Sequence, residues 1–133
     1  MSATGFDIRM PFVEHLGLQL LEKADGRARV RLDPRPEHLN SWGAVHGGVL
    51  LSILDVVLSS AARALDPTCT GATTVEMKVN FLAAARGTVL AEGRATRAGR
   101  TLIFAEGELV DSDGEVLAKG NGTFKLIYPK PQD

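Results

Sequence analysis

One uninterrupted run, GGVLLSILDVVLSSAARAL at positions 47–65, constrains the fold more than any other feature. It contains no proline, it is too long for an ordinary strand, and Asp66-Pro67 ends it, so it predicts a helix. A helix that is apolar on every side in its first half belongs in a core. The rest of the chain must therefore supply a sheet that curves around this helix. Because one sheet cannot cover the whole helix, a second copy of the chain is expected as well.

Six segments around this helix have the character of strands. Residues 27–32 alternate between basic and apolar side chains, which is the period of a strand with one wet face. The separators after the helix are short and contain glycine, as tight antiparallel connections require. A hairpin, one long helix and a four-stranded meander predict an α+β fold, not alternating βαβ units. The predicted strands are 18–23, 27–32, 73–82, 88–97, 100–111 and 115–128, after a short opening helix at 9–15.

Composition and charge narrow the classes of function. The 133 residues have the length of one domain, so 1–133 is predicted to form a single domain. The net charge is -1 and the basic residues are dispersed, so no nucleic-acid partner is expected. The amino-terminal residues lack the apolar core of a secretory signal, and the longest apolar stretch is too short to span a bilayer. These features predict a cytoplasmic protein with no membrane partner.

The histidines and the cysteine do not suggest a metal centre. His15, His38 and His46 lack the spacing of a helical metal site, and no cysteine pair is present to help. Cys69 is the single cysteine, so it cannot form an internal disulfide, which fits a reducing compartment, and it is expected to pack as a small apolar side chain. No metal and no other cofactor is therefore expected.

Asp55 is the residue least suited to the apolar helix. It stands between Leu54 and Val56, and burying an unpaired carboxylate is costly unless the group finds partners or its pKa rises. A carboxylate that caps buried amides or pairs with an arginine is one explanation. A general base or nucleophile in a partly desolvated site is the other.

His46-Gly47-Gly48 stands at the predicted start of the helix. A helix start presents unpaired N–H groups and a partial positive charge, and glycines let a ligand approach the backbone, so an oxyanion could be held there. A tight loop-to-helix turn explains the glycines equally well. Helical rise separates Gly47 from Asp55 by about 12 Å. A two-fold dimer could bring one chain's helix start to the other chain's Asp55. Asn40 either forms a local turn or orients a substrate.

The run Asn40-x-x-Gly43-x-x-His46-Gly47-Gly48-x6-Asp55 resembles the signature of the PaaI-type hotdog thioesterases, the phenylacetate-degradation branch of that superfamily. The resemblance extends over nearly the whole chain, and residues 74–77 and 99–102 are similar to family segments as well. It implies a hotdog fold, with a curved antiparallel sheet wrapped around one long buried helix. It also implies hydrolysis of an aromatic or medium-chain acyl-CoA by a homodimer or homotetramer whose active sites lie at the subunit interface.

The resemblance further implies a role for each residue of the motif. Gly47 N–H would polarise the thioester carbonyl, and Asp55 of the opposite subunit would activate water or attack the carbonyl directly. Asn40 would position the substrate or the water, His46 would order the loop, and Thr74 would bond the nucleophilic water. Residues implied to contact the substrate or coenzyme A are Gly48, Arg97, Gly99, Arg100, Thr101 and Leu102.

Two other functions remain open on the same scaffold. One is a non-hydrolytic acyl-CoA-binding domain, although a binding pocket gains nothing from a buried carboxylate. The other is an acyl-thioester hydratase or dehydratase, although the chain lacks the His-Phe-Pro run typical of hotdog dehydratases. The acyl preference is expected to depend on residues such as Leu51, Leu54, Leu58, Phe81 and Phe12.

Overall fold

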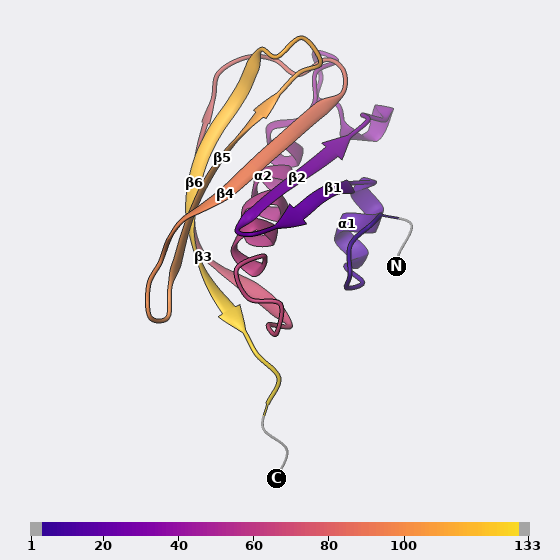
Figure 1. Ribbon diagram of the computed structural model, residues 1–133. Coiled ribbons are helices and arrows are strands. Elements are labelled where there is room, and N and C mark those ends of the chain that lie inside the picture. Colours follow the sequence, from indigo (N-terminus) through magenta and orange to yellow (C-terminus); the bar gives the residue numbers. More distant parts are fainter. Residues whose placement is uncertain (1–3, 131–133) are drawn as a thin grey trace.

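One six-stranded antiparallel sheet curves around one long helix in the computed structural model, which describes residues 4–130 (Figure 1). The spatial order of the strands is β1-β2-β4-β5-β6-β3, and every neighbouring pair is antiparallel. The predicted α+β fold with a curved antiparallel sheet is confirmed. The elements are α1 (Pro11–Leu16), β1 (Gln19–Ala24), β2 (Arg27–Leu32), the 3-10 turn η1 (Pro36–His38), α2 (Gly47–Arg63), β3 (Gly71–Phe81), β4 (Val89–Ala98), β5 (Ile103–Val110) and β6 (Val116–Ile127).

The long helix α2 ends at Arg63, two residues earlier than the sequence predicts. Leu65 N–H donates to the Ala62 carbonyl at 3.2 Å, and Asp66 N–H donates to the Arg63 carbonyl at 3.1 Å. Both bonds span three residues, so the chain tightens into a final turn before the proline. No helix among residues 4–130 is long and apolar enough to cross a membrane.

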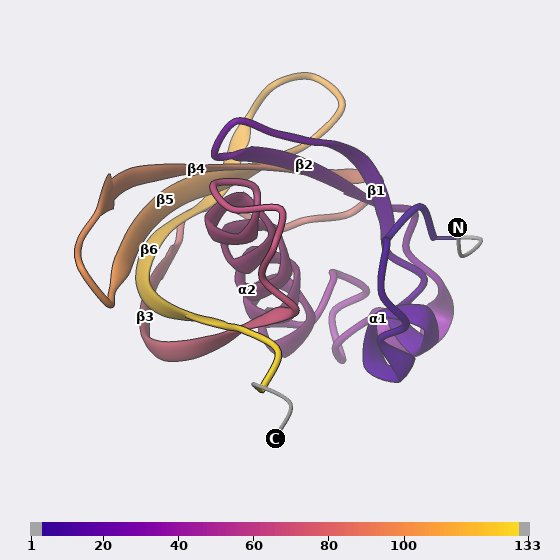
Figure 2. The same ribbon diagram turned by 60° about the horizontal axis from the view of Figure 1, so that its bottom comes forward.

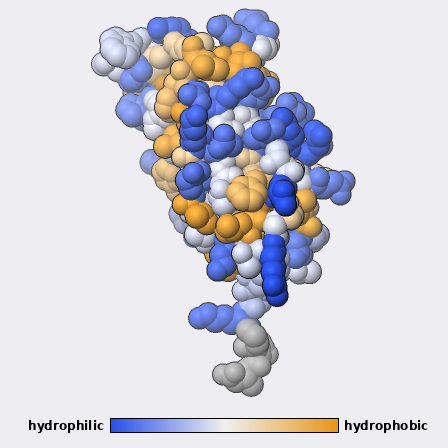
Figure 3. All heavy atoms as spheres, turned by 90° about the vertical axis from the view of Figure 1, so that its left-hand side faces the viewer, coloured by the Kyte–Doolittle hydropathy of each residue, from blue (hydrophilic) through white to orange (hydrophobic). Residues whose placement is uncertain are grey.

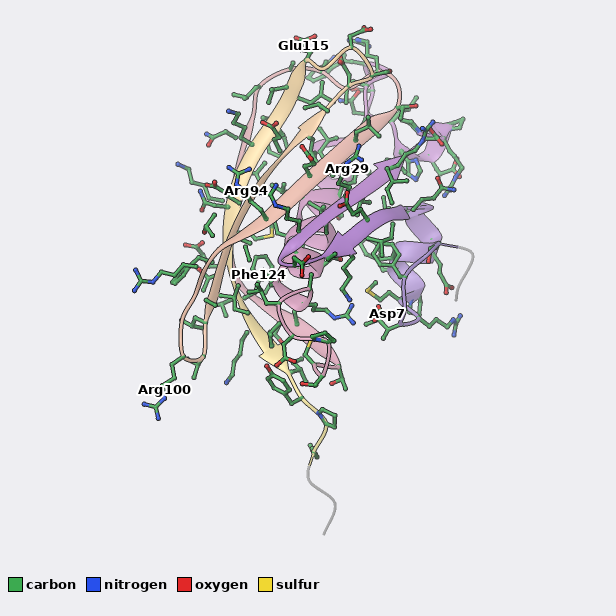
Figure 4. The ribbon with its side chains drawn as sticks, viewed as in Figure 1. Asp7, Arg29, Arg94, Arg100, Glu115 and Phe124 are labelled. Carbon is green, nitrogen blue, oxygen red and sulfur yellow. The ribbon has the colours of Figure 1, made fainter. Side chains whose placement is uncertain are left out.

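The strand β2 alternates as predicted. Ala28, Val30 and Leu32 are fully buried, while the arginines between them lie on the outer face of the sheet. Arg29 and Arg94 both lie on this face (Figure 4), where they pair across strands with glutamates of the neighbouring strands. Such exposed pairs add little stability each, so the core supplies most of it. Viewed from the β6 side, the surface shows hydrophobic patches among charged groups (Figure 3).

A row of glycines lets α2 lie close to the sheet. Gly93 pairs with Gly107 and Gly107 pairs with Gly120, so the row crosses β4, β5 and β6. A Cβ on Gly107 would lie 3.0 Å from Leu58 of α2, and one on Gly120 would overlap Leu54. Both leucines are fully buried against the sheet. They are therefore core residues and do not line an acyl pocket, in contrast to the expectation from the sequence.

The edge strand β3 and one face of α2 remain uncovered. The sheet encloses α2 on two sides, and α1 lies beside the β1 end (Figure 2). Along β3, one edge pairs with β6, the other edge is free in the described chain, and Val75 is 55% exposed. The accessible residues of α2 recur every three or four positions, so they form a single face. After the first turn of α2, where Gly47, Gly48 and Val49 are all accessible, these residues are Leu51, Ser52, Asp55 and Ser59.

Candidate active site

Asp55 lies at the middle of the uncovered face of α2, where it is half-buried and not enclosed in the core. The Thr74 hydroxyl of β3 donates to Asp55 Oδ1 at 2.5 Å. No cation lies within ion-pairing distance of this carboxylate among residues 4–130. The carboxylate is therefore held by one neutral donor and open on its other side, which does not fit a structural ion pair. Thr74, expected at a strand start, is the fourth residue of β3.

Gly47 is the first residue of α2, and its N–H has no acceptor among the described residues. His46 is the N-cap, and its Nδ1 accepts the Gly48 N–H at 2.8 Å. Nδ1 is therefore the acceptor nitrogen of the His46 ring, and Nε2 is its other polar atom. The Gly48 N–H is thus satisfied, and Gly47 alone of these two glycines offers a free donor at the positive end of the helix.

Asn40 shapes the loop that leads to this helix start. Its Oδ1 accepts the Trp42 N–H at 2.9 Å and the Ala44 N–H at 3.1 Å. The Asn40 N–H donates to the Ala44 carbonyl at 2.7 Å, and Gly43 adopts a φ of 77° within the loop. The carboxamide oxygen of Asn40 is therefore engaged in a local turn, which leaves its NH2 group as the part available to a ligand.

The structure does not gather the predicted residues at one point of one chain. Gly47 and Asp55 lie on the same helix, eight residues and about 12 Å of helical rise apart. Asp55 is joined to Thr74, whereas Gly47 lies beside Phe81, whose ring is 3.7 Å from where a Cβ on Gly47 would stand. The two halves of the predicted site are thus found near opposite ends of β3.

Of the residues at 97–102 that the resemblance implies to contact coenzyme A, only some line a common cavity. A cavity of about 390 Å³ is lined by Gly99, Arg100 and Thr101, whereas Arg97 and Leu102 do not line it. The Leu102 carbonyl instead accepts the Gly99 N–H at 2.7 Å and closes the β4–β5 turn. Arg100 lies at the tip of this turn and points away from the sheet (Figure 4).

Two residues of this cavity carried no signal in the sequence. Lys125 and Tyr128, at the end of β6, line the same cavity. The Tyr128 hydroxyl donates to Asp66 at 2.7 Å. This bond raises the pKa of Tyr128, and hydrogen bonds from Thr68 and Tyr128 lower the pKa of Asp66. The carboxylate is thus already satisfied, which leaves Lys125 and Arg100 as cations without a carboxylate partner among residues 4–130.

A second cavity, of about 310 Å³, opens beside Gly47. Trp42, Phe81 and Arg86 line it together with Asn40 and Gly47. Its walls come from the loop before α2 and from the segment after β3, which are far apart in the sequence. The sequence predicts roles for Asn40, Gly47 and Phe81 separately, but it does not predict that they line one cavity.

The largest cavity, about 620 Å³, lies at the carboxyl end of α2, away from Asp55 and Gly47, and it shares Asp66 with the 390 Å³ cavity. Arg63, only 6% exposed, reaches Asp7 at 3.2 Å there, and Lys23 approaches the same carboxylate at 3.5 Å. Burial acts to raise the pKa of Asp7, but the charges of Arg63 and Lys23 outweigh it and bring the pKa below its usual value. Both cations of this cavity thus share the carboxylate of Asp7.

No group of three or more His, Cys, Asp or Glu side chains that could hold a metal ion exists among residues 4–130. Cys69 is buried, and its Sγ lies 3.8 Å from the Arg63 carbonyl. The groups present around Asp55 and Gly47 are a carboxylate, a hydroxyl and a backbone N–H.

Comparison with known proteins identifies the family of this chain. The family model of the thioesterase superfamily matches residues 43–118, which include Gly47, Asp55 and Thr74. A protein of Saccharolobus solfataricus named "Putative esterase" is 31% identical over 118 residues, which cover 88% of this chain and 84% of that protein.

Solved structures share the fold. A conserved protein from Pseudomonas aeruginosa is 32% identical, with a TM-score of 0.82 over 90% of this chain and 95% of that one. The PaaI protein from the phenylacetic acid degradation operon of E. coli is 21% identical, with a TM-score of 0.82 over 90% of this chain and 86% of that one. The family match and the curved sheet around α2 show that this chain belongs to the thioesterase superfamily and has the hotdog fold of that family.

Proposed function

We propose that this protein hydrolyses acyl-CoA thioesters to a free acid and coenzyme A. The observation that supports this most is the Asp55 carboxylate, which one hydroxyl orients on the accessible face of an otherwise buried helix. A carboxylate with an open side can take a proton from water or attack a carbonyl itself. The thioester is already an activated acyl group, so the reaction requires no cofactor.

The residues divide the chemistry as follows. Asp55 takes a proton from water, the resulting oxygen forms a bond to the thioester carbon, and the carbonyl oxygen becomes negative. Gly47 N–H donates to that oxygen at the positive end of α2. The carbonyl then re-forms as the C–S bond breaks, and the sulfur leaves as a thiolate that takes from Asp55 the proton that came from water. In a second route Asp55 attacks the carbon itself, and water hydrolyses the resulting anhydride.

Pairing of β3 with the same strand of a second chain is the proposed way to unite Gly47 and Asp55. A long free edge is a template for strand pairing, and β3 has 11 residues. Thr74 marks the Asp55 end of this strand, and Phe81 marks the Gly47 end. An antiparallel pair with its two-fold axis near Met77 and Lys78 would set Thr74 of one chain opposite Phe81 of the other. Asp55 of one chain would then face Gly47 of the other.

The nucleotide part of coenzyme A is proposed to occupy the 390 Å³ cavity. Arg100 and Lys125 offer positive charge for phosphate groups, and Tyr128 offers an aromatic ring. Leu65, just beyond the carboxyl end of α2, also lines this cavity. A thioester held there would extend along the accessible face of the helix toward Asp55.

The deciding experiment measures free thiol released from a panel of acyl-CoAs by the purified protein and by Asp55→Asn. The variant is expected to lose at least about 100-fold in kcat, the usual contribution of a positioned acid or base. Asp113→Asn, which changes an exposed carboxylate in the β5–β6 turn, is the matched control and should retain parental activity.

Three outcomes would contradict the proposal. A folded Asp55→Asn protein that retains the parental rate would remove Asp55 from the mechanism. Binding of acyl-CoA without thiol release would indicate a binding domain. Addition of water to an enoyl-CoA without thiol release would indicate a hydratase.

A further inference from the structure

The cavity beside Gly47 is apolar apart from one cation and one amide. Trp42, 79% exposed, and Phe81 supply its aromatic surface, and alanines at 83–85 form one of its walls. Its volume of about 310 Å³ lies at the lower end of the range for small-molecule sites, so it suits a short acyl group better than a long chain. Because Gly47 also lines it, an acyl group whose carbonyl meets the Gly47 N–H has this cavity directly beside it.

Arg86 is the one charged residue among those that line this cavity. Its Nη1 donates to the Trp42 carbonyl at 3.1 Å, and this is the one hydrogen bond of its side chain within residues 4–130. No carboxylate of that part of the chain pairs with it. A guanidinium has five N–H donors in a planar fork that matches a carboxylate. Arg86 therefore has donors to spare for a ligand.

The segment that carries Arg86 is fixed to the loop before α2. The Val45 N–H donates to the Ala85 carbonyl at 2.8 Å, one residue from Arg86. Arg86 in turn holds the Trp42 carbonyl, and its Nη1 lies 4.0 Å from where a Cβ on Gly43 would stand. The guanidinium is thus positioned by the backbone at the rim of the cavity and does not hang freely from the surface.

We infer that the preferred acyl group is short and ends in a carboxylate, which Arg86 binds while the Trp42 and Phe81 rings flank the carbon chain. This inference rests on the proposed thioesterase function and specifies its substrate class as CoA monothioesters of short dicarboxylic acids. A carboxylate bound by a guanidinium gains a charge-assisted hydrogen bond that a methyl group at the same position cannot make.

The test compares pairs of substrates that differ only at the distal end of the acyl chain. The pairs are succinyl-CoA with butyryl-CoA, glutaryl-CoA with valeryl-CoA, and adipyl-CoA with hexanoyl-CoA. In at least one pair, the parental protein should show the higher kcat/KM for the carboxylate. Arg86→Gln should lower kcat/KM for that substrate by about 10-fold or more and leave its neutral partner nearly unchanged. Arg86→Lys should restore part of the preference. Arg27→Gln, an exposed arginine of β2, should change neither.

Two results would overturn the inference and leave hydrolysis intact. One is a parental preference for the neutral substrate in all three pairs. The other is an equal loss for both members of a pair in Arg86→Gln, which would assign Arg86 to the coenzyme A carrier. If no substrate releases thiol, the proposed hydrolysis is contradicted, and the inference about Arg86 is then tested by binding alone. The dissociation constants of the same pairs for the parental protein and Arg86→Gln then decide whether Arg86 recognises the carboxylate.

Discussion

At the scale of single residues, the Thr74 hydroxyl governs how the Asp55 carboxylate is held. It supplies the one hydrogen bond that this carboxylate accepts from within residues 4–130. Thr74 belongs to an edge strand, so its position depends on β3 and not on the helix that carries Asp55. The sequence predicts both residues for the site. It cannot predict their contact, because that depends on how β3 lies along α2.

Thr74→Val is therefore expected to lower kcat by about 10-fold or more, with little change in KM, because valine keeps the shape and the strand preference but removes the donor. Thr74→Ser, which keeps the hydroxyl, should retain most of the activity. Steady-state kinetics with one acyl-CoA measures both. Thr73→Val changes the neighbouring exposed threonine and should behave like the parent. An equal loss in Thr74→Ser and Thr74→Val would show that packing, and not the hydroxyl, matters.

His38 gives a separate prediction on stability. It is 3% exposed, and its Nδ1 accepts the Arg35 N–H at 2.9 Å. Burial, together with the charge of Arg35, lowers the pKa of His38 below 6.5. The unfolded chain therefore binds the proton more readily than the folded chain. The free energy of unfolding should fall as the pH decreases below 6.5 toward the folded pKa, and it should be fully retained above 6.5.

Urea unfolding at about pH 7.5 and about pH 5.5 measures this dependence, because most carboxylates remain ionised over that range. His38→Gln should reduce the difference between the two pH values. His15→Gln, a change at an exposed histidine whose charge is the smallest of the causes acting on the pKa of His38, should change the difference only slightly. If His38→Gln shows the same difference in the free energy of unfolding between the two pH values as the parental protein, then His38 is not the source of the pH dependence.

At the scale of elements, the periodicity of the sequence predicts which segments are helices or strands, but it does not predict how closely these elements pack. The alternation in β2 and the length of the apolar run in α2 correctly predict a strand and a helix. The glycines inside β4, β5 and β6 are visible in the sequence. The sequence does not show that they form one row against which α2 packs. Which glycine faces the helix depends on strand register, and register follows from bulges and turns that local patterns leave open.

Gly107→Ala should destabilise the protein by about 1–3 kcal/mol, the usual cost of an overpacked core. A Cβ there would collide with the backbone carbonyl of Glu92, which cannot move without distorting β4, and it would also meet Leu58. Denaturant unfolding gives the change. Gly87→Ala is the control, because a Cβ on Gly87 would meet nothing within 4 Å, and its stability should match or slightly exceed that of the parent. Equal stability of the two variants would contradict the close helix–sheet contact.

At the scale of the whole molecule, the separation of Gly47 and Asp55 within one chain is the most informative property. The sequence predicts Gly47 and Asp55 on one helix, and the structure adds the free edge of β3 beside them. The cavity beside Gly47 could not be predicted from the sequence, although the sequence predicts roles for Asn40 and Phe81, because its walls join segments that only tertiary folding brings together. If two chains pair through β3 as proposed, each site takes the Gly47 N–H from one chain and the Asp55 carboxylate from the other, and this can be tested.

Two inactive variants are expected to restore activity when they share a dimer. Asp55→Ala lacks the carboxylate, and Gly47→Pro lacks the N–H. Proline suits the first position of a helix, and the ψ of 139° at His46 is compatible with a following proline. In a mixed dimer, the intact Gly47 of one chain meets the intact Asp55 of the other, while the second site carries both defects. Protein that is co-expressed with two affinity tags and purified through both should regain about half of the parental activity. The matched control replaces the Gly47→Pro chain with one that carries both substitutions, which leaves no intact site in any dimer. If the doubly tagged mixed dimer is as inactive as Asp55→Ala and Gly47→Pro are separately, then no site combines Gly47 of one chain with Asp55 of the other. Pairing through β3 would then not build the site.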